Sequence, residues 1–307
     1  MSAIQIKWLD DPVFGKLVQL TNGLVELRVT TDFGPRVIHA SVSGMDNMFY
    51  EDREKKKLAD PYDVYGGDQQ ILYGGHRIWI SPEIVPRCYH PDNAPVTTVP
   101  IENGMSFVGA LEEHNQIQKI MTIQLPEDKP GVTITHTIRN TGLWDIELAP
   151  WCITMLAAGG QEIMPMPDRK TGFLNNRNIS LWDYSEMNDS RVYWGKDFIT
   201  LRQEASKQNP FKLGFNNEAG WAAYFNKGQA FVKFFEPAQE GFYPDNNCCF
   251  ESYTNGFMLE METLGEFVQL GPDECVTHME EWEVHKCAFS PTDDETALKE
   301  AVKPFID

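Results

Sequence analysis

The 307-residue sequence lacks several features that would assign it to a common class of protein. It has no run of about 18 apolar residues, so nothing in it predicts a membrane span. Its start, Met1-Ser2-Ala3-Ile4-Gln5-Ile6-Lys7, lacks the apolar centre of a signal peptide. Its six cysteines form neither CxxC pairs nor the dense spacing of a disulfide framework. We therefore expect a cytoplasmic protein that does not associate with membranes.

The motifs of several enzyme classes are also missing. There is no GxSxG elbow, no phosphate-binding GxxxxGK[ST], no HExxH and no dinucleotide fingerprint, which argues against serine hydrolases, nucleoside triphosphatases and zincins. Basic residues are scarce, because 26 Lys and Arg stand against 45 Asp and Glu and give a formal net charge of −19. Such a chain repels a phosphate backbone, so nucleic acid is excluded as a partner. We predict no cofactor and no metal site.

The sequence does contain repeated alternation of apolar and polar residues with a period of two. This pattern covers residues 25–30, after a Thr21-Asn22-Gly23 turn, and returns at 132–139, 257–262 and 276–284. Residues 159–198 show little periodicity and are expected to form long connections. The only persuasive helix is at 292–305, with Thr292 as its N-cap. We therefore predict an all-β antiparallel fold in one domain spanning residues 1–307.

The stretch at 73–83 has the composition of a site for a polar small molecule. Two adjacent glycines, which allow a tight turn or a close backbone approach, are followed by His76, Arg77, Trp79 and Glu83. Each of these residues also has a structural alternative, as a core histidine, an ion-paired arginine or a buried tryptophan. His90 lies on a Pro-bounded loop that is equally typical of a binding rim and of an ordinary polar connection.

In two other segments the period-two pattern indicates which face of a strand carries the titratable side chains. Glu260 and Glu262 alternate with apolar residues and so project from one face of a strand, roughly 7 Å apart. On a solvent-facing strand they would be ordinary surface charges. His136 shares a face with apolar residues, which favours a hydrogen-bonded core histidine over a catalyst.

Four segments together resemble the galactose mutarotase-like superfamily and, within it, a poorly characterised bacterial family with a Gly-Gly-His-Arg motif. They are Asn22-Gly23-Leu24-Val25-Glu26-Leu27, Phe33-Gly34-Pro35-Arg36-Val37-Ile38, Gly74-Gly75-His76-Arg77-Ile78-Trp79 and Phe257-Met258-Leu259-Glu260-Met261-Glu262-Thr263-Leu264-Gly265. The resemblance extends from the first hairpin to about Trp282. It implies an antiparallel β-supersandwich with a sugar pocket across one sheet.

The resemblance also implies roles for individual residues. Glu262 falls on the glutamate that serves aldose 1-epimerases as a base, whereas Trp151 stands near the position of their acid histidine, so His76 is the expected acid. Indole rings suit the C–H face of a pyranose, and cationic side chains suit a carboxylate or phosphate. The substrate-binding residues that we expect on these grounds are Arg36, Arg77, Trp79, His90, Trp151, Lys212, Asp245 and Glu251.

The expected function is therefore acid/base catalysis on a sugar or an acidic sugar derivative by an isomerase of the aldose 1-epimerase type. Two alternatives stay open from the sequence. One is a glycoside-cleaving or eliminating enzyme on the same fold, which would also need an acid and a base. The other is a carbohydrate-binding protein without turnover, which the tryptophan at the position of the acid histidine favours.

Overall fold

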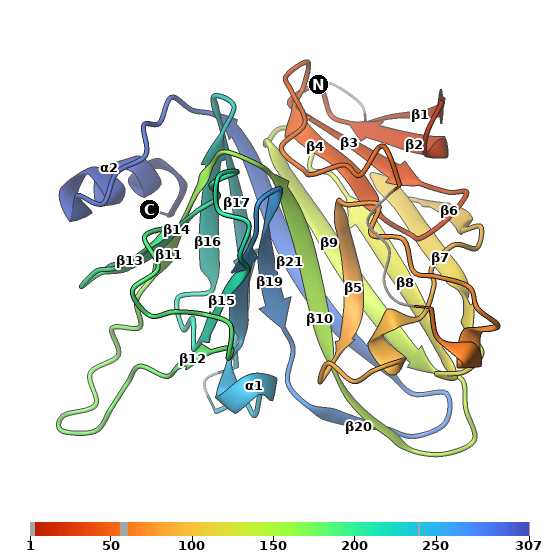
Figure 1. Cartoon of the computed structure of the whole chain (residues 1–307). Coiled ribbons are helices and arrows are strands. Elements are labelled where there is room, and N and C mark those ends of the chain that lie inside the picture. Colours follow the sequence, from red (N-terminus) through yellow and green to blue (C-terminus); the bar gives the residue numbers. More distant parts are fainter. Residues whose placement is uncertain (1–3, 56–60, 239, 307) are drawn as a thin grey trace.

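The computed structural model of the chain describes residues 4–55, 61–238 and 240–306, and strands dominate it. Two antiparallel sheets pack face to face, with the first sheet in front of the second in Figure 1. The predicted all-β antiparallel sandwich is thus confirmed. Sheets of this kind form because alternate residues of each strand pack into the space between the layers.

The first sheet has eleven strands, of which ten follow the order β1-β2-β3-β4-β5-β10-β19-β18-β15-β12 while β20 pairs with β10. Its strands are β1 (Gln5–Asp11), β2 (Gly15–Thr21), β3 (Val25–Thr30), β4 (Val37–Val42), β5 (His76–Ser81), β10 (Ile146–Ala157), β12 (Ile179–Leu181), β15 (Phe211–Phe215), β18 (Phe250–Thr254), β19 (Met258–Leu264) and β20 (Val268–Leu270).

The second sheet has ten strands in the order β13-β14-β11-β16-β17-β21-β9-β8-β7-β6. They are β6 (Thr97–Ile101), β7 (Gly104–Glu112), β8 (Ile117–Gln124), β9 (Gly131–Asn140), β11 (Gln161–Pro165), β13 (Val192–Trp194), β14 (Phe198–Arg202), β16 (Trp221–Asn226), β17 (Gln229–Phe235) and β21 (Cys275–Lys286).

Helical structure in the described residues is confined to short pieces and one C-terminal helix. The short pieces are the 3₁₀ turns η1 (Asp63–Tyr65) and η2 (Arg87–Tyr89) and the single turn α1 (Pro244–Asn247). The helix α2 (Glu295–Ile306) packs Leu298 and Val302 against strands of the second sheet. Among the described residues, none of the helices combines the length and the apolar character needed to cross a bilayer.

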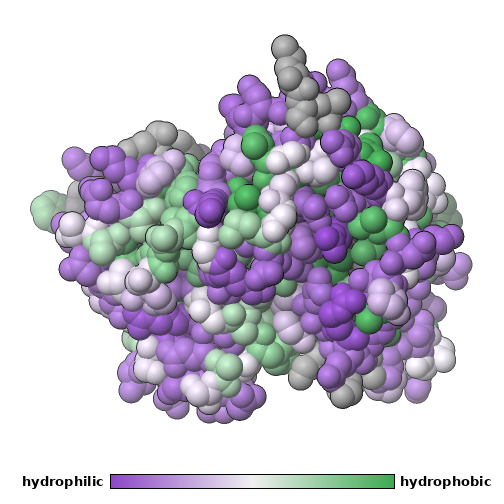
Figure 2. Space-filling view, turned by 90° about the horizontal axis from the view of Figure 1, so that it is seen from above, coloured by the Kyte–Doolittle hydropathy of each residue, from purple (hydrophilic) through white to green (hydrophobic). Residues whose placement is uncertain are grey.

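The main hydrophobic core lies between the sheets and draws residues from both. Trp282 of β21 is fully buried, with its ring centroid 5.6 Å from that of Phe49 and 5.3 Å from that of Phe231. Outward-facing residues are mostly polar, and Figure 2 shows apolar residues only in small groups on the face seen from above. The shared core favours the predicted single domain of residues 1–307, which stays a prediction.

The Gly-Gly pair sets the entry of the chain into β5. Both glycines have positive φ angles, +98° at Gly74 and +71° at Gly75. A Cβ atom at Gly74 would lie 2.1 Å from the carbonyl oxygen of Tyr50, and one at Gly75 would lie 2.3 Å from that of Val37. Any other residue would clash with these backbone atoms, so the pair fixes how β5 enters the sheet.

Two sequence-based expectations differ from the structure. Residues 159–198 are not only connections, because they contain β11, β12 and β13; the first of these is a buried strand whose near-continuous burial gives no period-two pattern. The helix N-cap is Asp294 rather than Thr292, since the Asp294 Oδ1 atom accepts a hydrogen bond from the Ala297 amide at 2.8 Å. His136 is a core histidine, as predicted.

One buried carboxyl group between the sheets makes stability depend on pH. Glu162 of β11 is fully buried and accepts a hydrogen bond from Ser252 Oγ of β18 across the sandwich, while its Oε1 atom has no partner among the described residues. Burial, more than any other effect, raises the pKa of Glu162 to about 8. The side chain is therefore neutral at pH 7.

We predict that Glu162→Gln stabilises the protein at pH 9 and has little effect at pH 5. Because the folded-state pKa is raised, the stability that neutral Glu162 contributes is fully present below the unfolded pKa near 4.5 and is lost as pH rises through 8. Urea unfolding of the variant and wild type from pH 5 to 9 tests this, with exposed Glu113→Gln as control. A difference between variant and wild type that is constant over this pH range would contradict the prediction.

Candidate functional site

A pocket of about 350 Å³ lies on the face of the first sheet that points away from the second sheet. Its floor comes from β5, β10, β15, β18 and β19, and its rim comes from the loops before β5, after β5 and after β12. The residues that line it are Gln70, Leu72, Arg77, Trp79, Glu83, Tyr89, Trp151, Ile153, Tyr184, Lys212, Tyr253, Asn255, Phe257, Met258 and Glu260.

Strand alternation decides which predicted residues reach this pocket. Arg77 and Trp79 are two apart on β5 and share the pocket face, and Trp151 lies beside Trp79 in the register of β10. The two indole rings meet at a centroid distance of 5.4 Å and an angle of 77°. Together they form an apolar wall that is edged by polar groups.

A buried charge cluster lies directly behind the pocket wall. Lys212 of β15 lines the pocket, and its Nζ atom is 2.7 Å from Glu251 Oε2 and 3.0 Å from Glu262 Oε2. Trp151 Nε1 also donates a hydrogen bond to Glu262, at 2.6 Å. The ammonium group lies 4.6 Å from the ring centroid of Trp182 and 4.8 Å from that of Trp151. Glu262 is fully buried and is not among the residues that line the pocket.

The ionisable groups of this cluster shift one another's pKa values. Burial alone would lower the pKa of Lys212, but Glu251 and Glu262 outweigh that effect and hold it well above its usual value. Burial raises the pKa of Glu251 well above its usual value, against the opposing effect of Lys212. Lys212 is therefore held as an ammonium group between two buried carboxyl groups.

Glu260 is the titratable group of β19 that the pocket exposes. It is half-buried, and burial followed by the charge of Glu262 raises its pKa to about 8. Its carboxyl group is therefore protonated at neutral pH and can donate a proton to a ligand. The sequence placed Glu260 on the same strand face as Glu262 but offered no reason to choose it for the site.

Arg77 is a buried cation without a hydrogen-bonded partner. Its side chain is nearly fully buried, and its Cζ atom lies 4.1 Å from the centroid of the Trp79 ring. The Nε and Nη1 atoms make no hydrogen bond to any described residue. Burial and then the charge of Arg36 lower the pKa of Arg77 to about 9, which leaves the guanidinium charged at neutral pH.

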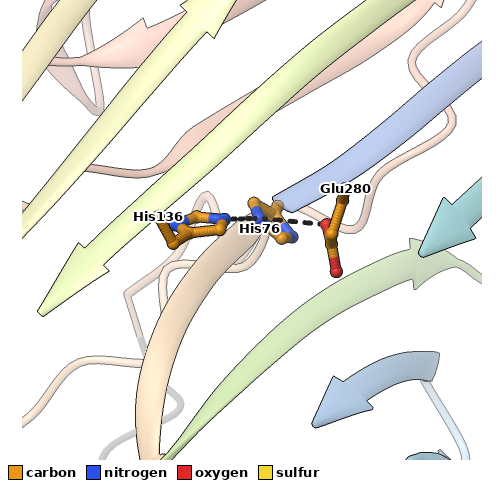
Figure 3. Close-up of side chains that lie close together, drawn as sticks. All are labelled: His76, His136 and Glu280. Carbon is orange, nitrogen blue, oxygen red and sulfur yellow. Dashed lines mark hydrogen bonds and ion pairs between the residues drawn. The ribbon is translucent and has the colours of Figure 1, made fainter. Parts of the chain in front are cut away.

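The structure places His76 away from this pocket, in the interior of the sandwich. Its Nδ1 atom is 2.8 Å from Thr154 Oγ1, and its Nε2 atom is 2.8 Å from His136 Nε2 and 3.7 Å from Glu280 Oε2. Figure 3 shows the His76 ring between His136 and Glu280, which belong to the second sheet. The expectation that His76 and Glu262 line one pocket is therefore wrong, because neighbours on a strand face opposite ways and Arg77 takes the pocket side.

Four other predicted residues also lie outside the pocket lining, and one of them, Glu251, is the buried partner of Lys212. Arg36 is fully buried, binds Asp92 through Nε and Nη2 at 2.9 and 3.0 Å, and donates to backbone carbonyls of residues 71–74. His90 lines a separate cavity of about 90 Å³. Asp245 is exposed on α1, where its backbone oxygen accepts a hydrogen bond from Ser180 Oγ. Their predicted contacts with a substrate are not supported by these positions.

Several pocket residues had no predicted role. Glu83 belongs to the stretch at 73–83 that the sequence indicated as a site, but no role was predicted for it. It is exposed at the rim and accepts a hydrogen bond from Tyr89 Oη, and burial raises the pKa of Tyr89, which keeps the phenol protonated. Tyr253 could have been predicted from Glu251, because the two residues lie two positions apart on β18 and so share one face of the strand. Tyr184 comes from a loop without periodicity, so no pattern in the sequence indicated it.

The best donor set for a metal ion is the inter-sheet cluster rather than the pocket. Ligand atoms of His76, His136 and Glu280 lie within 4.8 Å of one another. Glu280, however, already pairs with Lys233 Nζ at 2.8 Å and accepts hydrogen bonds from Thr263 Oγ1 and Trp282 Nε1. The same cluster includes Lys233, fully buried, so a metal ion would add positive charge beside a buried ammonium group. These residues do not fit a metal, and the predicted lack of a metal site stays a prediction.

Comparisons with known proteins bear on the fold. No family model and no curated protein matches the sequence. A protein named as a candidate aldose 1-epimerase from Klebsiella pneumoniae is similar to the chain at 9% identity and a TM-score of 0.57, over 98% of this chain and 86% of that one. A galactose mutarotase-like protein from Lactobacillus casei is similar at 8% identity and a TM-score of 0.55, over 88% of this chain and 100% of that one. A TPR-domain containing protein from Parabacteroides distasonis is similar at 14% identity and a TM-score of 0.62, over 90% of this chain and 48% of that one.

The chain thus spans about half the length of the Parabacteroides protein and nearly the whole of the Lactobacillus protein. At these identities the similarity establishes a fold and not an activity. The chain has the galactose mutarotase-like fold, as the resemblance in the sequence implied.

We predict that His76→Asn weakens folding and leaves the affinity of the pocket for its ligand unchanged. The shorter side chain loses hydrogen bonds to Thr154 and His136 inside the sandwich, which costs about 2 kcal/mol of unfolding free energy. Urea unfolding and titration with the best sugar found by screening measure the two quantities. A selective loss of ligand affinity at unchanged stability would show that His76 belongs to the site.

We also predict that Lys212→Met destabilises the protein by about 3 to 5 kcal/mol, because Glu251 and Glu262 would be left buried without a counter-charge. The loss should be smaller at pH 5 than at pH 8, because burial raises the pKa of Glu251 and protonation at the lower pH removes its unpaired charge. The double variant Lys212→Met/Glu262→Gln removes one of these charges and should recover part of the loss. Chemical unfolding checks both variants, and an equal loss in the single and double variants would contradict the assigned charge balance.

Proposed function

We propose that the pocket binds one sugar ring and that the protein catalyses acid/base interconversion at the anomeric carbon, as an isomerase of the aldose 1-epimerase type. Trp79 and Trp151 offer apolar surface to the C–H face of a pyranose. Gln70, Tyr184 and Asn255 supply hydrogen-bonding groups around that surface. A volume of about 350 Å³ suits a single ring with its hydroxyl groups.

The main support for catalysis comes from Glu260. Anomeric interconversion requires a group that donates a proton to the ring oxygen while another accepts the proton of the anomeric hydroxyl. Glu260 lines the pocket, and a pKa of about 8 keeps it protonated at neutral pH and close to the working range of a general acid. It thereby replaces His76, the acid expected from the sequence.

A second carboxyl group in the same pocket completes the proton exchange. Glu83 faces the pocket and is oriented by the hydroxyl group of Tyr89, so it is the proposed base. The base takes the proton from the anomeric oxygen, the bond between the anomeric carbon and the ring oxygen breaks, and Glu260 protonates the ring oxygen. Rotation of the aldehyde group and reversal of these steps give the other anomer and restore both side chains.

Glu262 takes a positioning role in this proposal. Its carboxylate lies behind Lys212 and Trp151, so a ligand in the pocket meets the ammonium group before it meets Glu262. With Glu251, it holds Lys212 at the pocket wall, where the ammonium group can donate to a sugar hydroxyl. The names of the similar structures, galactose mutarotase-like and candidate aldose 1-epimerase, agree with this reaction type.

We predict that Glu260→Gln slows anomeric exchange by roughly 100-fold or more, because the general acid is lost. In the wild type the catalysed rate should be constant below pH 8 and fall about tenfold per pH unit above it, since only protonated Glu260 donates. Exchange spectroscopy by NMR on a panel of sugars measures the rates after subtraction of the uncatalysed reaction.

Exposed Glu127→Gln serves as the matched control for loss of one carboxylate and should keep the wild-type rate and pH profile. A Glu260→Gln variant that binds sugar and exchanges anomers at the wild-type rate would refute the acid role. Binding without exchange in the wild type would instead indicate a carbohydrate-binding protein.

A further inference from the structure

Arg77 differs from Arg36 and Lys212, two other described cations that line or adjoin the pocket, in having no hydrogen-bonded partner. Arg36, its neighbour in space, is held by both oxygens of Asp92 and by backbone carbonyls. Lys212 is held by Glu251 and Glu262. Arg77 is only 3% exposed, yet its Nε and Nη1 atoms are unpaired among the described residues. A buried guanidinium that makes no hydrogen bond is costly, so an acceptor from a ligand at its pocket-facing edge would be favoured.

The guanidinium group of Arg77 lies at the wall of the pocket, beside the Trp79 ring. Its Cζ atom lies 4.1 Å from the Trp79 ring centroid, and both residues line the pocket. The carboxyl groups that could reach it are engaged or neutral at pH 7, because Asp92 binds Arg36 and Glu260 keeps its proton. Among the described residues that line the pocket, Arg77 is therefore a cation to which no carboxylate is hydrogen-bonded, and its guanidinium group is a planar donor.

We infer that the ligand of this pocket is a uronic acid, a sugar whose terminal carbon is a carboxylate, and that Arg77 binds this carboxylate. This inference rests on the proposed function and names its substrate class. A neutral sugar would leave the charge of Arg77 unpaired. A phosphate dianion would carry a second charge for which the described lining residues offer no free cation, since Lys212 is already paired.

The register of the sheet supports a ligand one ring long. Ile153 of β10 pairs with Arg77 on one side and with Glu262 on the other, so β5 and β19 are two strand spacings apart, roughly 10 Å. In a hexopyranuronate the ring oxygen is bonded both to the anomeric carbon and to the carbon that bears the carboxylate. A uronate whose carboxylate binds Arg77 on β5 thus keeps its ring oxygen and anomeric carbon within one ring of Arg77, and Glu260 of β19 interacts electrostatically with Arg77 across the same pocket.

The test compares sugars that differ only in the terminal group. Isothermal titration with galacturonate, galactose, glucuronate, glucose and glucose 6-phosphate gives affinities for the wild type, Arg77→Met and Arg77→Lys. We expect each uronate to bind the wild type at least tenfold more tightly than its neutral parent and than the phosphate. Arg77→Met should abolish this preference, and Arg77→Lys should retain only part of it, because lysine keeps the charge without the planar fork.

Two controls separate binding from folding. Arg139→Met removes an exposed cation that pairs with Asp273 far from the pocket lining, and it should keep the uronate preference. Thermal unfolding of ligand-free Arg77→Met should match or exceed the wild type, because the variant removes an unpaired buried charge. An unfolded or strongly destabilised Arg77→Met, with Arg77→Lys still preferring uronates fully, would show that Arg77 is structural and overturn the inference.

Three other outcomes would overturn the inference that the ligand is a uronate. They are equal affinity for uronates and neutral sugars, a preference for the phosphate, and no binding of any of the five sugars. Anomeric exchange measured on the same ligands distinguishes this failure from failure of the proposed function. If neutral sugars exchange and uronates are not preferred, the proposed isomerase activity stands and the inferred uronate substrate is refuted. If uronates are preferred but no sugar exchanges, the uronate ligand stands and the isomerase activity is refuted.

Discussion

The strict alternation of side chains on a sheet that is covered on both faces governs this molecule. The strands β5, β10 and β19 have the second sheet on one side and the pocket on the other. Each residue must therefore serve either the interior of the sandwich or the ligand. On β5 this divides His76, which bonds to His136 in the interior, from Arg77, which lines the pocket. A shift of one residue in register would exchange the two sets, so the hydrophobic core also fixes the chemistry of the site.

Electrostatic balance is the second condition that the fold satisfies. The interior holds Glu280 beside Lys233, and although burial alone would raise the pKa of Glu280, Lys233 and the nearby histidines hold it below its usual range. Burial likewise keeps His76 neutral by lowering its pKa well below the usual value. In the interior cluster, Glu280 is thus held by Lys233, Thr263 and Trp282, whereas the guanidinium of Arg77 lines the pocket without a hydrogen-bonded partner among the described residues.

The sequence predicted the class of fold well, because period-two segments and turn residues are local signals. It also identified Arg77, Trp79, Trp151 and Lys212, which the structure brings together in one pocket wall. The prediction that His76 is the acid was wrong, because His76 and Arg77 are neighbours on one strand and their side chains therefore point to opposite faces of the sheet. The raised pKa of Glu260 could not be predicted, since it depends on burial and on a neighbouring charge that only the assembled sheet provides.

A crystal structure of the protein with a bound hexuronate would test the central claim most directly, namely that the ligand site lies on the Arg77 face of the first sheet. The account predicts that the sugar ring lies against Trp79 and Trp151, with its carboxylate on Arg77 and its ring oxygen within hydrogen-bonding distance of Glu260. A hexuronate bound instead in the larger cavity of about 750 Å³ beside Trp221 and Tyr243, or bound with its carboxylate away from Arg77, would contradict it.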